Sequence, residues 1–213
     1  MRIILASTSP RRREILALLG LPFEVRPPDF LETTHDDHTP EAEAVALALG
    51  KARSITCGEP RTMVVGGDTL IALDDKKIGK PEDPADAVSI LERLSGRTHR
   101  ILTGVAMIDS GTGREHTHLD RIDVRMHHSS RTEIAAYVSR GESMDKAGAY
   151  SIQGEGHRLI EGIRGDYLAA VGLPLRPIAA VLGRAGVEVP TDVERLYRER
   201  SLWTWSRVSA ETD

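Results

Sequence analysis

The sequence predicts a mixed α/β (α+β) fold, in which helices flank a central sheet whose strands are not all parallel. Two observations favour this class. Short apolar runs alternate along the chain with segments that begin at a helix-capping residue. In addition, the turn-forming residues 109–113 separate two β-rich segments, 101–108 and 117–124, which is typical of an antiparallel hairpin.

Apolar runs bounded by turn residues predict the strands. Residues 3–6 form such a run before a Ser-Thr-Ser sequence, and residues 63–65 form another before Gly66 and Gly67. A glycine-rich stretch from 142 to 174 holds three shorter candidates. The expected strands are therefore 3–6, 23–25, 63–65 with its continuation 70–73, the two arms of the hairpin, 149–152, 159–163 and 167–171.

Capping residues predict where the helices begin. Ser9, Thr39 and Asp83 each precede a proline, a combination preferred at the N-cap and the first helical position. Two later segments begin with a Ser/Thr-x-x-Glu capping box, at residues 130 and 191. The expected helices are therefore 9–20, 39–57, 83–95, 130–141, 177–182 and a last one from 191 that carries Tyr197, Leu202 and Trp203.

Composition and charge exclude several classes of protein. The 213-residue chain has a net charge of −4, which argues against broad nucleic-acid binding. Its single cysteine, Cys57, rules out an internal disulfide and favours a reducing compartment. The apolar runs are too short to span a bilayer, and no signal-peptide core follows the first residues. We therefore expect a cytoplasmic protein.

The chain shows no repeat, low-complexity block or long linker that would divide it. We expect residues 1–190 to form one domain and residues 191–213 to form a helical extension. Trp203 and Trp205 of this extension would pack either on the domain or on a partner.

The first candidate site is the start of the first predicted helix. Free backbone N–H groups at a helix N-terminus attract anions, and the hydroxyls of Ser7 and Ser9 would add donors. Arg11 and Arg12 would supply forked donors suited to phosphate. The alternative is an ordinary capped helix with a solvated basic face.

Further candidates lie in three loops or strand ends. Asp68 follows two glycines that would let a ligand approach, and it could serve as a base or a metal ligand, or simply stand in a polar turn. Lys80 stands between a glycine and a proline, a shape that could aim its charge at a phosphate. Lys146 and Gln153 lie in a segment of small residues, where the Gln153 amide suits a base edge.

Together these residues suggest a polyanionic substrate. Lys51 joins the four cations already named, and against these five cations the sequence offers few candidate carboxylates. Because phosphate anhydrides react slowly in water, catalysis must neutralise charge and position the attacking water. Asp68 and Glu32 could hold Mg²⁺ or Mn²⁺ through oxygen ligands. The residue types and their spacing alone do not identify the substrate or the reaction further.

The ordered motifs resemble those of the Maf family of septum formation inhibitor-like proteins, over roughly residues 2–185. Each motif is weak alone, but the whole series in register is specific. The matching motifs are Ser7-Thr8-Ser9-Pro10-Arg11-Arg12, Glu32, Lys51-Ala52, Gly67-Asp68-Thr69, Gly79-Lys80-Pro81, Leu94-Ser95-Gly96 with His99, residues 145–150, Ile152-Gln153-Gly154 and residues 171–174.

The resemblance implies a fold and an activity. The fold would be a mixed sheet with two lobes around a cleft, similar to inosine triphosphate pyrophosphatases, and homodimers are common. The activity would be that of a nucleoside triphosphate pyrophosphatase, which releases pyrophosphate and a nucleoside monophosphate. The segments around residues 145–154 look like those of the subgroup that acts on dTTP, UTP and modified pyrimidine nucleotides. Such an enzyme would keep non-standard nucleotides out of nucleic acids and could have a role in cell division arrest.

The resemblance also implies residue roles. Asp68 would be the general base and would bind Mg²⁺, Mn²⁺ or Co²⁺ together with Glu32, while the cationic residues Lys51 and Lys80 complete the catalytic set. The remaining expected substrate-binding residues are Ser7, Ser9, Arg11, Arg12, Thr69, Lys146 and Gln153, of which Arg11, Thr69 and Gln153 are tied to substrate choice. Ser151 departs from the subgroup, which usually has glycine there.

Two other functions remain open from the sequence. A non-catalytic, nucleotide-sensing regulator of septum formation would bind nucleotides without releasing pyrophosphate. A nucleotidyltransferase would run related chemistry but would need a sugar phosphate as acceptor.

Overall fold

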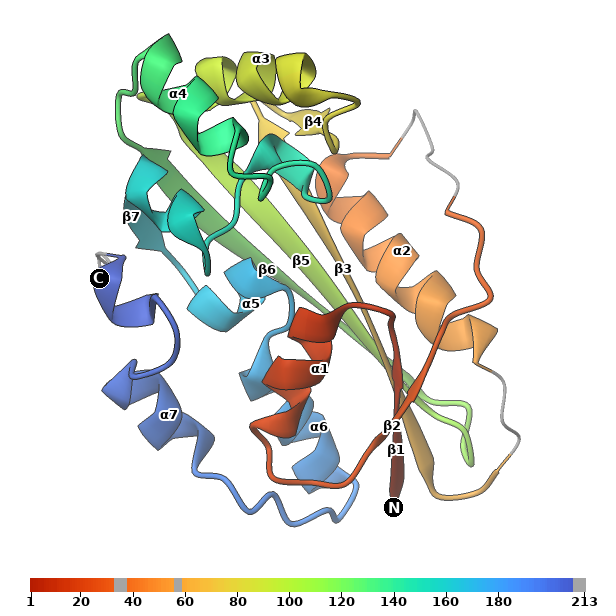
Figure 1. Ribbon diagram of the computed structural model, residues 1–213. Helices are drawn as coiled ribbons and strands as arrows, with labels where there is room; N and C mark the ends of the chain where they lie inside the picture. Colours follow the sequence, from red (N-terminus) through yellow and green to blue (C-terminus); the bar gives the residue numbers. More distant parts are fainter. Residues whose placement is uncertain (33–37, 56–58, 209–213) are drawn as a thin grey trace.

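The computed structural model describes residues 1–32, 38–55 and 59–208 (Figure 1). Cys57 lies outside these residues, so the expectation about it has no structural outcome. Seven strands form one mixed sheet in the order β2-β1-β3-β5-β6-β7, with β4 paired to β3. The strands are β1 Arg2–Ala6, β2 Glu24–Arg26, β3 Thr62–Leu73, β4 Lys76–Ile78, β5 Thr98–Asp109, β6 Glu115–Met126 and β7 Ile160–Arg164.

Helices cover both faces and one end of this sheet (Figure 1). They are α1 Pro10–Ala17, α2 Pro40–Ser54, α3 Pro84–Leu94, α4 Arg131–Val138, α5 Tyr167–Val171, α6 Leu175–Arg184 and α7 Val193–Glu199. Short 3₁₀ turns occupy Ala147–Ala149, Glu155–Leu159 and Trp205–Arg207. No helix in the described ranges combines the length and apolar character needed to cross a membrane. The predicted mixed α/β class is confirmed.

The predicted helix starts are confirmed at four positions and shifted at one. The side chains of Ser9, Thr39, Asp83 and Ser130 each accept a backbone hydrogen bond at the first turn of their helix. At α7 the cap is Asp192, because Thr191 instead donates to the carbonyl of Leu18 at 2.7 Å. The helix also ends at Glu199, so residues 202 and 203 lie beyond it.

Two of the three short strand predictions after residue 142 are wrong. Residues 167–171 form helix α5, because the Asp166 carboxylate accepts from the backbone N–H groups of Leu168 and Ala169 at 2.7 and 3.1 Å. The run is buried on all sides, so its periodicity could not distinguish a helix from a strand. Residues 149–152 are not extended as a strand, since Gly148 and Ala149 have positive φ angles of 73° and 59°.

Helix α2 packs unusually close to its face of the sheet, through the small residues Ala44, Ala48 and Ala52. A Cβ atom on Gly66 would lie 2.4 Å from the carbonyl oxygen of Ala48. A Cβ atom on Gly104 would lie 2.3 Å from that of Ala44. The absence of a side chain at Gly66 therefore allows the backbone of α2 to pack against β3. The prediction that Gly66 lets a ligand approach is wrong.

An opening in the sheet lies beside the middle of β3. On that side β1 ends with Ala6 opposite Gly66, and β4 begins to pair only at Ile71. Residues 67–70 of β3 therefore have no strand partner on that side within the described part of the chain. The opening stands at the carboxyl end of β1, where α1 begins, and carboxyl ends of strands are common ligand sites in α/β sheets.

Candidate active site

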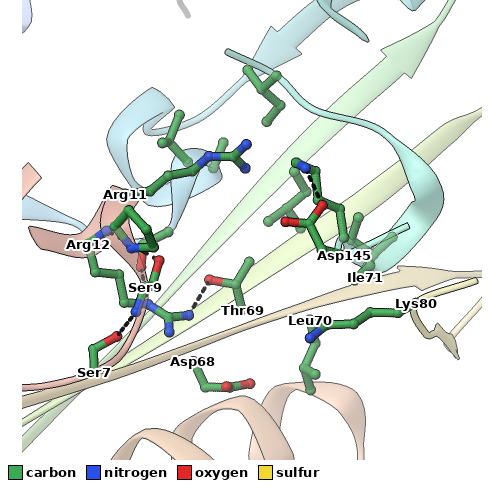
Figure 2. A pocket seen from close by; sticks show the side chains of 18 of the residues that line it. Ser7, Ser9, Arg11, Arg12, Asp68, Thr69, Leu70, Ile71, Lys80 and Asp145 are labelled. Carbon is green, nitrogen blue, oxygen red and sulfur yellow. Dashed lines mark hydrogen bonds and ion pairs between the residues drawn. The ribbon is translucent and has the colours of Figure 1, made fainter. Parts of the chain in front are cut away.

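A pocket of about 900 Å³ occupies this opening, a size typical of small-molecule sites (Figure 2). Its lining comes mainly from the end of β1 and the start of α1, from β3 and β4, from residues 145–153 and from the end of α5. All the predicted site residues line it, namely Ser7, Ser9, Arg11, Arg12, Glu32, Lys51, Asp68, Thr69, Lys80, Lys146 and Gln153.

The charged wall of the pocket consists of Asp68, Lys51 and Glu32. The Lys51 ammonium lies 2.5 Å from Asp68 Oδ1 and 2.7 Å from Glu32 Oε1. Lys51 and Asp68 are buried, whereas the Glu32 side chain is 57% exposed. The hydrogen bond from Lys51 lowers the pKa of Glu32. The Lys51 ammonium thus holds both carboxylates in place. Lys51 reaches Asp68 because α2 packs close to β3.

The start of α1 forms an anion-binding edge. Ser7 Oγ accepts from the backbone N–H of Ser9 at 3.1 Å, and Ser9 Oγ accepts from that of Arg12 at 3.4 Å. These bonds hold the loop after β1 so that the helix N-terminus faces the pocket, as Figure 2 shows for Ser7 and Ser9. A helix N-terminus presents partial positive charge and N–H donors, which favours phosphate oxygens.

Arg12 is held by a chain of hydrogen bonds through the sheet. Its Nε donates to the carbonyl of Gly172 at 3.0 Å, and its Nη2 donates to Thr69 Oγ1 at 3.2 Å. Thr69 and Thr103 hydroxyls lie 3.1 Å apart, and Thr103 donates to the carbonyl of Ala169 at 2.8 Å. Because the Thr103 proton is used there, Thr69 donates to Thr103 and accepts from Arg12.

Thr103 was not predicted from the sequence. It is fully buried and does not itself line the pocket. One signal could have found it, since it is a hydroxyl within the otherwise apolar segment 101–108 of a predicted strand. A buried hydroxyl needs a partner, and here the partner is a predicted site residue, Thr69.

The loop wall of the pocket is formed by residues 145–154, opposite the charged wall. Figure 2 shows Arg11 and Asp68 at opposite sides, with Arg12 and Thr69 between them. Arg11 Nη2 donates to Ser151 Oγ at 3.0 Å, and the same oxygen accepts from the backbone of Gly154 at 3.3 Å. Ser151, the departure from the family pattern, is therefore a direct partner of Arg11.

Gln153 on the loop wall has an unsatisfied donor. Its Nε2 is buried and has no hydrogen-bond partner among the residues that the structure describes. A buried amide without a partner is costly, so an acceptor on a ligand would be favoured there. The carbonyl oxygen of a nucleobase is such an acceptor.

The charge balance of the lining differs from the sequence expectation of few carboxylates, because Glu14, Glu32, Asp68 and Asp145 all contribute. Lys51 is paired as described, and Lys146 pairs with Asp145 and donates to the Glu142 carbonyl at 2.9 Å. Within residues 1–32, 38–55 and 59–208, no carboxylate forms an ion pair with the remaining cations, which are Arg11, Arg12 and Lys80. These three carry the attraction for an anion.

The donor set fits a divalent cation. Asp68 and Glu32 converge on one ammonium, so both carboxylates reach the same small volume of the pocket. Within the described residues no three candidate ligand side chains form a cluster. Mg²⁺ is commonly bound by one or two carboxylates together with substrate phosphates and water, which this pair would allow.

Fold and site together define an α/β protein with a pocket for a phosphorylated ligand. The sequence pattern of the Maf-like protein family matches residues 2–185, and the chain belongs to this family. It is 46% identical over 188 residues to a dTTP/UTP pyrophosphatase of Moorella thermoacetica, covering 88% of this chain and 97% of that protein. It is 43% identical to a dTTP/UTP pyrophosphatase of Symbiobacterium thermophilum, covering 89% and 97%.

Two solved structures are similar to this chain at low sequence identity. A nucleoside-triphosphatase / dITP/XTP pyrophosphatase from Mycobacterium abscessus superposes with a TM-score of 0.43 and 17% identity, covering 75% of this chain and 82% of that one. A Ham1 protein from Staphylococcus aureus gives a TM-score of 0.41 and 13% identity, covering 59% and 72%.

Proposed function

We propose that this protein is a nucleoside triphosphate pyrophosphatase that acts on dTTP, UTP and modified pyrimidine nucleotides. The observation that carries the proposal is the arrangement of opposite charges in one pocket. A buried carboxylate, Asp68, shares the pocket with a helix N-terminus and with Arg12 and Lys80, which form no ion pair with a carboxylate in the described part of the chain. This set can bind a polyphosphate and hold a general base, Asp68, near it. The dTTP/UTP pyrophosphatases among the relatives support the substrate class.

The proposed reaction is hydrolysis at the α-phosphorus. A water oxygen bonds to this phosphorus, the bond from it to the bridging oxygen of the β-phosphate breaks, and pyrophosphate leaves. Asp68 Oδ2 receives the proton of the attacking water, because Oδ1 is engaged by Lys51. Arg11, Arg12 and Lys80 neutralise the charge that develops on the leaving group. Ser7 and Ser9 orient the phosphates at the start of α1.

Asp68 and Glu32 are the residues that would hold Mg²⁺, Mn²⁺ or Co²⁺. The ion would supply charge neutralisation for the phosphate oxygens and would orient the substrate. Lys51 would then keep the two carboxylates at a fixed separation when the cation binds.

The loop wall would receive the base. Gln153 Nε2, which has no hydrogen-bond partner among the described residues, would donate to a pyrimidine carbonyl, and Lys146 lines the same pocket. Thr69 and Arg11 would set the space between base and phosphates. Hydrolysis of non-standard nucleotides at this site would keep them out of nucleic acids.

The deciding experiment is product analysis on a panel of nucleoside triphosphates with Mg²⁺, Mn²⁺ or Co²⁺. We expect pyrophosphate together with UMP or dTMP, and loss of both products on addition of a chelator. Orthophosphate as the product would contradict attack at the α-phosphorus. Binding of the nucleotides without any product would favour a nucleotide-sensing regulator of septum formation instead.

We further propose that the protein works in the cytoplasm, as its single cysteine and short apolar runs favour, and that it is a homodimer, as the family resemblance implies. Nucleoside triphosphates, the proposed substrates, are available there. Sedimentation of the purified chain at several concentrations tests the dimer, and a monomer throughout would contradict it.

A further inference from the structure

The segment 191–208 lies beyond residues 2–185, which match the family pattern, yet it contacts two walls of the pocket. The matched relatives are covered almost completely by the rest of the chain, so this segment is an addition to the shared fold. We propose that Thr204 is a positioning residue for the loop wall and that this segment thereby sets how tightly the nucleotide binds. This inference rests on the proposed function.

The first contact is a hydrogen bond to the loop wall itself. Thr204 Oγ1 donates to the carbonyl of Ile152 at 2.7 Å, and Ile152 lines the pocket between Ser151 and Gln153. The Tyr167 hydroxyl lies 3.0 Å from the same oxygen. Because the Thr204 proton goes to Ile152, the Tyr167 hydroxyl donates to Thr204. All three groups are buried, so these bonds are shielded from water.

The second contact is aromatic packing that fixes Thr204. The neighbouring Trp205 is stacked on Tyr167, with ring centroids 5.0 Å apart and planes 11° apart. It also meets Tyr197 of α7 edge to face at 5.3 Å. Trp205 is 5% exposed, whereas Trp203 is 38% exposed. The segment is therefore anchored to the body of the protein at Trp205.

The third contact reaches the wall formed by α5. Tyr197 donates to Asp166 Oδ2 at 2.6 Å and accepts from the backbone of Leu175 at 3.3 Å. Asp166 caps α5, whose far end lines the pocket and whose following residue, Gly172, accepts from Arg12. The segment thus braces the residue that holds Arg12 as well as the loop that carries Gln153.

The loop wall needs such a brace because it has no strand of its own. Between residues 144 and 159 the described backbone forms only 3₁₀ turns and irregular structure, so no sheet ladder fixes the Ile152 carbonyl. Without Thr204 that buried carbonyl would lose its partner, and the neighbouring Gln153 would be free to shift. Among the described residues, the ion pairs of Lys51 with Asp68 and Glu32 do not involve the segment, so the charged wall should keep its geometry.

The test compares Thr204→Val, which removes the hydroxyl, with Thr204→Ser, which keeps it. Thr132→Val, on the exposed face of α4, is the matched control. For Thr204→Val we expect an increase of about three- to tenfold in KM for dTTP and UTP with kcat within about twofold. The Kd of a non-hydrolysable dTTP analogue should rise by the same factor. Thr204→Ser and Thr132→Val should resemble the wild type.

A second pair of variants covers the case in which Thr204→Val does not fold. Trp205→Ala should raise the Kd of the analogue, whereas Trp203→Ala should leave it unchanged. A folded Thr204→Val protein with wild-type Kd and KM would overturn the positioning role. Because the Kd is measured without turnover, failure of the proposed function would appear separately, as a wild-type protein that binds the analogue but releases no pyrophosphate.

Discussion

The charged wall and the loop wall of the pocket are built in different ways. Asp68 and Lys51 sit on a central strand and a long helix, where sheet pairing and close packing fix their positions. The loop wall has no strand, and Ser151 and Ile152 are held by hydrogen bonds from other parts of the chain, including α1 and the segment after α7. Under the proposed function, the chemistry would be placed on rigid elements, and base recognition on a wall that other segments hold in position.

This contrast predicts where substitutions act. Changes at the charged wall should mainly lower kcat, because they alter the proposed general base and the groups that neutralise charge as the transition state forms. Changes at the loop wall should alter KM and the preference among nucleotides, because they alter how the ground state is held.

Asp68→Asn should have the largest effect. The amide keeps the shape of the side chain but cannot receive a proton, so kcat should fall by about 10²- to 10³-fold. Thermal unfolding should remain cooperative. Asp74→Asn, in the exposed ion pair with Arg97, is the matched control and should keep full activity. Turnover of Asp68→Asn near that of the wild type would remove Asp68 as the base.

Gly66→Ala tests what holds the charged wall together. The new methyl group would clash with the carbonyl of Ala48, push α2 outward and cost about 1–3 kcal/mol of unfolding free energy. Activity should fall as well, since Lys51 would move away from Asp68. Gly183→Ala, in α6 with open space around it, should instead be neutral or stabilising. Denaturant titration of both variants gives the comparison, and equal stability would contradict the close packing of α2.

His99, which is buried, and Asp166, which is half-buried at the start of α5, should give stability opposite pH dependences. Burial lowers the pKa of His99, whose Nε2 lies 2.7 Å from the Tyr150 hydroxyl, from 6.5 to about 4. The unfolded chain therefore takes up this proton first as pH falls below 6.5, and stability is lost. Burial raises the pKa of Asp166, which faces Tyr197 and the charge of Asp120, from 3.8 to about 6. The folded chain takes up that proton first below pH 6, and stability is gained.

The two effects oppose each other at pH 5, each being worth about 1–2 kcal/mol. On going from pH 7 to pH 5, His99→Gln should therefore lose less unfolding free energy than the wild type, and Asp166→Asn should lose more. Urea titrations at the two pH values measure this. If both variants lost the same unfolding free energy between pH 7 and pH 5, at least one of the two groups would titrate outside this pH range.

Ser151→Ala should have the smallest effect, confined to the loop wall. It removes the acceptor for Arg11 and should change the dTTP-to-purine preference in kcat/KM by about two- to fivefold. The kcat for dTTP should stay near that of the wild type. An unchanged preference would mean that the bond between Arg11 and Ser151 does not help to select the base.

Local sequence signals predicted much of the fold and many of the residues that line the pocket. Proline after a capping residue marks the start of α1, α2 and α3, because both preferences act within one turn of helix. The site residues were found through charged and small residues in motifs that resemble a family, and the pocket contains all of them.

Tertiary features could not be predicted in the same way. The run 167–171 is buried on every side, so it carries no periodicity, and α5 depends on the cap at Asp166. The bond from Thr204 to Ile152 joins residues 52 positions apart, and no local pattern indicates it. The role of Gly66 depends on the packing of α2 against the sheet, which no local sequence pattern indicates.

The pocket also joins parts of the chain that are far apart in sequence, which has a consequence for folding. Arg12 bonds to a residue 160 positions away, and Arg11 bonds to one 140 positions away. Contacts of this range are slow to form because long loops must close first, whereas the β5–β6 hairpin is local. A folding intermediate could therefore contain the β5–β6 hairpin before the pocket has formed. Nucleotide binding would then report the last stage of folding, and bound nucleotide would stabilise only the complete fold.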